Sequence, residues 1–147
     1  MRFFPFELTD SQLQLGLQQR MEAVSPDRMP DDVLIVEDDP IIAVDFEDRI
    51  LGLGVRTVRT AASVAKALEM IVNRAPDFAL LDVALVRENS FAVAERLEAL
   101  QVPFGFVTGY GAAVSLPEAF ADRPRLAKPC LTDALKALLE GYPIMPA

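Results

Sequence analysis

Acidic side chains that directly follow an apolar run are the first candidates for chemistry in this sequence. The run Val33–Val36 is entirely apolar and is followed by Glu37, Asp38 and Asp39. Clustered carboxylates are the ligands that a hard cation such as Mg²⁺ prefers. They repel a bare phosphate, and the turn lacks the glycines of a phosphate-binding loop. The turn therefore indicates a cation site, although a solvated acidic turn explains this motif equally well when it is taken alone.

Three further polar residues stand at the ends of later segments that we expect to be strands. These residues are Asp82, Thr108 and Lys128. Each has an ordinary explanation by itself: Asp82 could cap a helix, and Thr108 could be an unremarkable strand residue. In a parallel sheet, however, the carboxyl ends of all strands lie at one edge, where ligands bind. The ordered set of acids, hydroxyl and lysine therefore indicates one shared site.

The chemistry that suits this set is phosphoryl transfer to a carboxylate, with Asp82 as the nucleophile. Glu37 and Asp38 would bind Mg²⁺, which neutralises the crowded acids and the incoming phosphoryl oxygens. Lys128 would pair with the Asp82 carboxylate and then with a phosphoryl oxygen. Thr108 would donate a hydrogen bond to another phosphoryl oxygen and so respond to the presence of the group.

The elements that position these residues alternate between apolar runs and amphipathic segments. We expect strands at residues 33–36, 55–60, 78–81, 103–107 and 125–127. We expect helices at residues 40–51, 64–75, 91–100, 115–122 and 131–139, with Ser63 capping the second and Ser115 and Glu118 forming a capping box in the fourth. Five such alternations predict an α/β fold with a parallel sheet and right-handed crossovers.

Composition limits the possible functions. The chain has 147 residues, of which 52% are hydrophobic, and this is enough for one domain with a substantial core. The net charge of −8 disfavours nucleic acid as a partner. No run approaches the ~20 apolar residues that cross a membrane. The single cysteine and the absence of a signal-like start predict a cytoplasmic protein, and the absence of histidine excludes His-dependent catalysis.

The first 31 residues differ from the rest and are expected to form an N-terminal helical extension with a linker. Leu13, Leu17, Met21 and Val24 fall on one face of the expected helix. This face either packs on the chain's own domain or makes a regulatory or homodimer contact, and amphipathicity does not decide between the two. We therefore divide the chain into an extension at 1–31 and a domain at 32–142.

The segment Pro-Phe-Gly-Phe-Val-Thr-Gly-Tyr-Gly at 103–111 resembles the signature of the alphaproteobacterial stand-alone receivers called the FAT GUY group. More broadly, residues 31–140 resemble the receiver domain of bacterial two-component response regulators. The resemblance implies a flavodoxin-like (βα)₅ doubly wound sheet. It also implies that a histidine kinase or phosphotransfer protein phosphorylates Asp82. It further implies that the backbone carbonyl of Ala84 completes the metal site, and that the Lys128–Pro129 peptide bond is cis.

The chain departs from the general receiver pattern in three places. Residues 83–90 lack the usual proline and glycine, Arg125 stands where many receivers carry an aromatic residue, and Cys130 replaces a bulky apolar one. Arg125 cannot serve as the aromatic partner to which Thr108 would pass the phosphorylation signal in many receivers. We expect the segment from Gly109 to Val114, with Tyr110, to take over the signalling role. We also expect the stretch from Gly109 to Phe120 to be the least ordered part of the domain without phosphorylation.

These observations predict a stand-alone response regulator that is not an enzyme and signals through a downstream protein partner. Only residues 143–147 follow Tyr142, so we expect no output domain. One alternative is a degenerate receiver that binds a partner without phosphorylation. Another is an aspartyl-phosphate phosphatase, which is disfavoured because its Asp-x-Asp motif is Asp82-Val83-Ala84 here.

Overall fold

The structure is a computed structural model, and it describes residues 29–109 and 116–141. The helix expected in the N-terminal extension and the proposed signalling residue Tyr110 lie outside these ranges. Within the described part of the chain, no helix is both long and apolar enough to cross a membrane.

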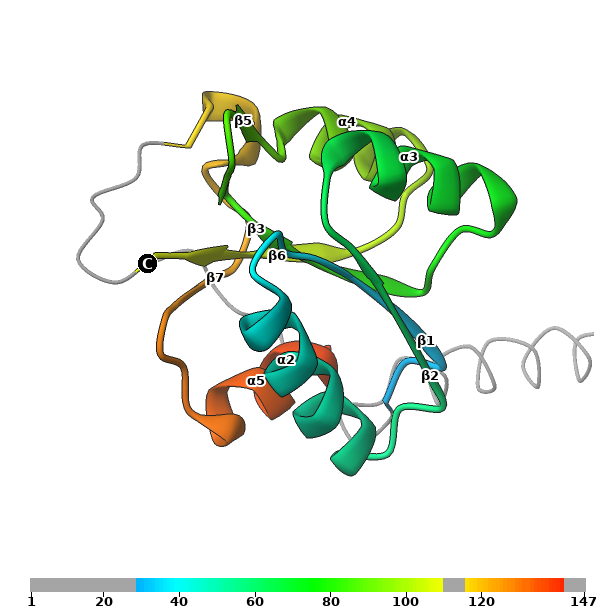
Figure 1. The fold of residues 1–147 in the computed structure, drawn as a ribbon, viewed down its shortest axis with the longest axis vertical. Coiled ribbons are helices and arrows are strands. Elements are labelled where there is room, and N and C mark those ends of the chain that lie inside the picture. Colours follow the sequence, from blue (N-terminus) through cyan, green and yellow to red (C-terminus); the bar gives the residue numbers. More distant parts are fainter. Residues whose placement is uncertain (1–28, 110–115, 142–147) are drawn as a thin grey trace, which may run out of the picture.

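A five-stranded parallel sheet forms the centre of the domain (Figure 1). Its strands are β1 (Asp32–Val36), β2 (Thr57–Ala61), β3 (Phe78–Asp82), β6 (Phe104–Thr108) and β7 (Arg125–Ala127). They lie in the order β2-β1-β3-β6-β7, and every neighbouring pair is parallel. Strand β1 lies inside the sheet between β2 and β3, and its apolar run is buried on both faces, as expected for an inner strand of a parallel sheet.

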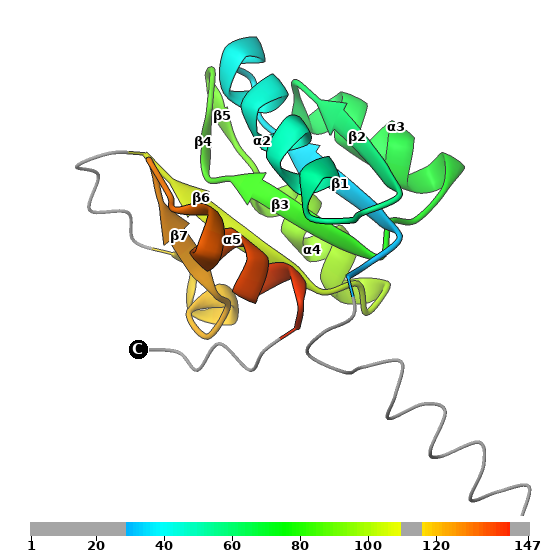
Figure 2. The same cartoon turned by 90° about the horizontal axis from the view of Figure 1, so that it is seen from below.

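Two helices cover each face of the sheet. Helices α3 (Val64–Asn73) and α4 (Phe91–Ala99) lie on one side, and α2 (Pro40–Gly52) and α5 (Thr132–Leu139) lie on the other (Figure 1). Figure 2 shows α2 and α5 in front of the sheet. The predicted flavodoxin-like, doubly wound α/β fold is therefore confirmed.

Each side of the sheet has its own core. On the α3/α4 side, Phe104, Phe106 and Phe120 pack with their ring centroids 5.6–5.9 Å apart. On the α2/α5 side, Phe46 and Leu135 belong to a second cluster that also contains residues of β1 and β3. The two cores fix the sheet between the helix layers and so fix the strand ends at which the polar residues stand.

Short polar contacts set where two of the helices begin. Asp39 caps α2, because its carboxylate accepts hydrogen bonds from the backbone N–H groups of Ile41 at 2.9 Å and Ile42 at 3.3 Å. Ser63 caps α3 as predicted, and its hydroxyl accepts the N–H of Lys66 at 3.2 Å. Of the three consecutive acids, Asp39 is thus engaged by the helix, which leaves Glu37 and Asp38 for other roles.

The structure contains one element that the sequence did not indicate. Strands β4 (Ala84–Leu85) and β5 (Glu88–Asn89) form a small antiparallel hairpin after β3, and Arg87 in its turn has a positive φ of 61°. From the sequence, residues 83–90 were expected to be the loop after Asp82, and they contain no glycine or proline to mark a hairpin turn.

The helix expected at 115–122 is replaced by a short 3₁₀ turn. This turn covers Glu118–Phe120 and follows Pro117, without a side-chain cap; Ser115, the other half of the expected capping box, lies outside the described residues. Proline fixes the backbone just before the turn, and Phe120 is only 3% exposed. Phe120 therefore anchors the described end of this segment, which we had expected to be poorly ordered, in the aromatic core.

Candidate functional site

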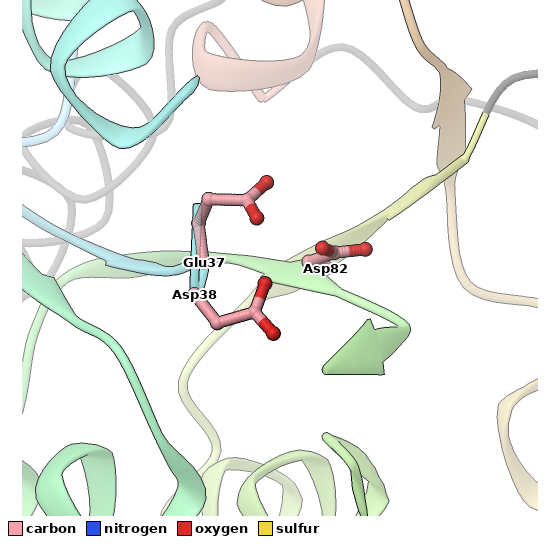
Figure 3. A group of neighbouring side chains, drawn as sticks. All are labelled: Glu37, Asp38 and Asp82. Carbon is pink, nitrogen blue, oxygen red and sulfur yellow. The ribbon is translucent and has the colours of Figure 1, made fainter. Parts of the chain in front are cut away.

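Three carboxylates meet at the carboxyl ends of β1 and β3. Glu37 and Asp38 follow β1, and Asp82 ends β3 (Figure 3). One carboxylate oxygen from each of the three lies within 4.8 Å of the other two. Glu37 is 3% exposed and Asp82 is 6% exposed, so two of the three negative charges are largely removed from water. These are the three acids that the sequence assigned to one site.

Lys128, which directly follows the edge strand β7, forms ion pairs with two of these acids. Its Nζ lies 2.6 Å from Glu37 Oε1 and 3.1 Å from Asp82 Oδ2. The backbone N–H of Lys128 donates to the carbonyl of Thr108 at 2.9 Å, so the pairing of β6 with β7 continues as far as the lysine. The following Lys128–Pro129 peptide bond is cis, as the family resemblance implied.

Burial and proximity perturb the protonation of this cluster. Burial raises the pKa of the Glu37 carboxyl above its ordinary value of 4.5; the hydrogen bond from Lys128 opposes this shift, and the nearby charge of Asp82 adds to it. For Lys128, burial alone would lower the pKa, but hydrogen bonds to Glu37 and Asp82 outweigh burial and raise it. Three carboxylates thus face one ammonium group, and this excess of negative charge and oxygen ligands fits a bound Mg²⁺.

The β4–β5 hairpin reaches this cluster through its backbone. The N–H of Val86 donates to Asp38 Oδ2 at 2.5 Å. Ala84, whose carbonyl the family resemblance assigned to the metal site, lies on β4 of the same hairpin. The sequence analysis did not identify Val86, because every residue except proline has a backbone N–H group and the residue type does not show which of these groups will donate.

Thr108 lies at the neighbouring strand end but makes a separate contact. It is 8% exposed, and its hydroxyl lies 3.5 Å from the carbonyl oxygen of Leu126. The structure therefore brings four of the expected side chains into one cluster, namely Glu37, Asp38, Asp82 and Lys128. It places the fifth, Thr108, at the end of β6 beside β3.

A cleft of about 480 Å³ opens beside Lys128 between α2 and the start of α5. Its lining residues are Ile42, Asp45, Phe46, Arg49, Gly109, Lys128, Pro129 and Cys130. Arg49 supports one wall, because its guanidinium donates to the carbonyl of Cys130 at 2.7 Å and to the hydroxyl of Thr132 at 3.1 Å. Sequence analysis did not identify these contacts, because Cys130 and Thr132 lie 81 and 83 positions after Arg49 in the chain.

Comparison with known proteins agrees with this geometry. The model of the response regulator receiver domain matches residues 33–140. The chain belongs to this family. It is therefore a signalling domain of two-component regulation rather than an enzyme, and its buried acid cluster lies at the strand ends where its fold class binds ligands.

Several relatives come from alphaproteobacteria. The phyllosphere-induced regulator PhyR of Methylorubrum extorquens is 33% identical over 110 residues, which are 69% of this chain and 39% of PhyR. The chain thus spans about two-fifths of the length of this curated relative. The solution structure of SdrG from Sphingomonas melonis Fr1 is 44% identical, covers 74% of this chain and 95% of SdrG, and has a TM-score of 0.64.

Two further solved structures are similar to this chain. The BeF3-activated conformation of SdrG, from Pseudomonas melonis Fr1, is 42% identical, covers 74% of this chain and 96% of SdrG, and has a TM-score of 0.62. The anti-anti-sigma factor PhyR from Bartonella quintana is 26% identical, covers 91% of this chain and 55% of that chain, and has a TM-score of 0.65.

Proposed function

We propose that this chain is a phosphorylation-dependent response regulator whose acceptor is Asp82. The observation that carries the proposal is the meeting of three carboxylates with one lysine at the carboxyl edge of the sheet. Glu37, Asp38, Asp82 and the backbone carbonyl of Ala84 would hold Mg²⁺. The ion would neutralise charge on the acids and on the incoming phosphoryl oxygens.

In the transfer step, a carboxylate oxygen of Asp82 attacks the phosphorus atom of a phosphohistidine. The new oxygen–phosphorus bond forms as the nitrogen–phosphorus bond breaks, and the leaving imidazole keeps the electron pair and takes up a proton from solvent. Lys128, already 3.1 Å from Asp82, can move its ammonium group to a phosphoryl oxygen without crossing the site. Thr108 would exchange its long contact to the Leu126 carbonyl for a hydrogen bond to another phosphoryl oxygen.

The phosphodonor is a histidine kinase or a phosphotransfer protein. The cleft beside Lys128 supports this assignment, because it is open to solvent between α2 and α5 and ends at a residue that contacts Asp82. Exposed apolar side chains on α2, Ile41 at 80% and Val44 at 54%, give a protein partner a surface to cover near that cleft.

The chain acts downstream by binding another protein, as a stand-alone receiver of the FAT GUY group in the cytoplasm. The signature at 103–111 and the 44% identity with SdrG support this narrower assignment. A PhyR relative is described as an anti-anti-sigma factor, so control of a sigma-factor network is the output that we propose. We keep the division into an extension at residues 1–31 and a receiver at residues 32–142 as part of this proposal; of the extension, the structure describes residues 29–31 alone.

Incubation of the full chain with Mg²⁺ and acetyl phosphate, followed by intact-protein mass spectrometry, tests the acceptor. We expect the mass of one phosphoryl group to appear on the wild type and to be absent from Asp82→Asn. Asp48→Asn is the matched control, because Asp48 is an exposed acid on α2 outside both the acid cluster and the cleft, and it should label like the wild type.

Other outcomes of this experiment identify the alternatives. Steady release of phosphate without accumulation would indicate a phosphatase. No labelling of the wild type would indicate a degenerate receiver that binds its partner without phosphorylation. Undiminished labelling of Asp82→Asn would move the acceptor to another acid, with Glu37 and Asp38 examined first.

A further inference from the structure

Glu88 connects the β4–β5 hairpin to a helix that takes no part in the site described above. Its Oε2 accepts the backbone N–H of Val64, the first residue of α3, at 3.1 Å. The first N–H groups of a helix have no partner within the helix, and a carboxylate is favoured there by the helix dipole. The carboxylate of Glu88 and the hydroxyl of Ser63 thus satisfy two different N–H groups at the start of α3.

The hairpin has few other contacts that fix its position. Leu85 is its only buried side chain, and Ala84, Glu88 and Asn89 are exposed. At its base, the N–H of Ser90 donates to the carbonyl of Val83 at 3.2 Å. Beyond the base, three hydrogen bonds join the hairpin to other elements: Val86 N–H donates to Asp38, Val64 N–H donates to Glu88, and Phe91 N–H, at the start of α4, donates to the side-chain oxygen of Asn89 at 3.0 Å.

The contacts with Asp38 and Val64 place the hairpin between the acid cluster and α3. Val86 joins it to Asp38, 48 positions earlier in the chain, and Glu88 joins it to Val64, 24 positions earlier. Figure 1 shows β5 on the α3/α4 side of the sheet, where such a bridge is possible. The hairpin therefore links the start of α3 to the backbone that faces Asp38.

We propose that Glu88 is a positioning residue for the cation site. By fastening β5 to the start of α3, Glu88 holds β4 so that Val86 N–H orients the Asp38 carboxylate and the Ala84 backbone stays close to the acids. The inference rests on the proposed function, because it takes Glu37, Asp38, Asp82 and Ala84 to be the ligands of Mg²⁺. Glu88 itself is not a ligand in this scheme.

Calorimetric titration of the full chain with Mg²⁺ tests the role of Glu88. Residues that orient metal ligands typically change metal affinity by 10–100-fold when they are replaced, so we expect Glu88→Ala to raise the Mg²⁺ Kd by about tenfold. Glu88→Gln keeps an oxygen that can accept the Val64 N–H, and we expect it to bind Mg²⁺ with nearly the wild-type Kd.

Glu69→Ala is the matched control for the loss of charge. Glu69 is an exposed acid on α3 that pairs with Lys66 at 3.2 Å and makes no hydrogen bond or ion pair with the hairpin. If Glu88 acted only through its negative charge, then Glu88→Gln and Glu69→Ala would weaken Mg²⁺ binding as much as Glu88→Ala. That pattern would overturn the positioning role.

Amide hydrogen exchange of the metal-free protein provides a readout that does not depend on Mg²⁺. In Glu88→Ala we expect faster exchange at Val64 and Val86 than in the wild type, with no such change in Glu69→Ala. If the wild type binds Mg²⁺ and Glu88→Ala has the same Kd, the positioning role is wrong while the proposed function stands. If the wild type binds no Mg²⁺, the proposed metal site is wrong, and this inference falls with it.

Discussion

Replacement of Lys128 by methionine should strongly destabilise the metal-free protein. Methionine keeps the length and the apolar stem of the side chain but removes the ammonium group that lies 2.6 Å from Glu37 and 3.1 Å from Asp82. The side chains involved are 16% exposed for Lys128, 2% for Glu37 and 7% for Asp82, so water screens these charges poorly. The variant therefore leaves two buried carboxylates without their cationic partner.

The expected loss follows from that burial. Removal of one partner from a buried ion pair costs about 3–5 kcal/mol, because the remaining charge stays buried and uncompensated. We expect about 3 kcal/mol here, at the lower end, because a carboxyl group can relieve part of the cost by taking up a proton. Mg²⁺ should stabilise Lys128→Met more than the wild type, because a cation in the acid cluster replaces part of the missing positive charge.

Urea denaturation in the presence of EDTA, with and without later addition of Mg²⁺, measures both effects. Lys136→Met is the matched control, because Lys136 makes a half-exposed ion pair with Glu140 at 3.9 Å. Such surface pairs contribute about 0–1 kcal/mol. If Lys128→Met is no less stable than Lys136→Met, the acid cluster does not depend on Lys128 for charge compensation, and our account of the site is wrong.

Three further predictions concern the metal, the pH dependence and the core. Mg²⁺ at ten times its Kd should stabilise the wild type by about 1.4 kcal/mol, and Asp38→Ala should lose most of the resulting rise in melting temperature; an equal rise in thermal scans of both proteins would contradict the site. Because the folded-state pKa of Glu37 is raised above 4.5, its stabilising contribution is full below that pH and is lost as the pH rises through the raised value. The metal-free wild type should therefore lose stability relative to Glu37→Gln as the pH increases, and a constant difference in urea unfolding would refute this. Phe120→Ala should cost about 3–5 kcal/mol in chemical denaturation, since Phe120 is 3% exposed and packs on Phe104 and Phe106; a change below 1 kcal/mol would show that its ring does not support the core.

Much of the fold could be predicted because its inner strands are almost entirely apolar. Strands β1 and β3 are buried on both faces, so after Asp32, the first residue of β1, their sequences contain no polar position until the strand ends. The polar residues Glu37 and Asp82 then stand at those ends. Parallel strands place their carboxyl ends at one edge of the sheet. This geometric rule is enough to predict that Glu37 and Lys128, which are 91 positions apart, come together.

The hairpin after β3 could not be predicted in the same way. Its strands have two residues each and its turn contains neither glycine nor proline, so no local pattern marks it. Its contacts with the acid cluster and with α3 involve Asp38 and Val64, which are distant in sequence. The 3₁₀ turn at Glu118–Phe120 likewise depends on burial of Phe120 in an aromatic core that is assembled from other elements.

The sequence by itself determined which chemical groups stand at the strand ends, because strand periodicity and residue type are local properties. Only the tertiary structure decided how these groups interact. It assigned Asp39 to the cap of α2 and Asp38 to the hairpin, and it paired Lys128 more closely with Glu37 than with Asp82. Burial and charge separation depend on every element that surrounds the site, and for this reason the raised pKa values of Glu37 and Lys128 arise only once the domain is folded.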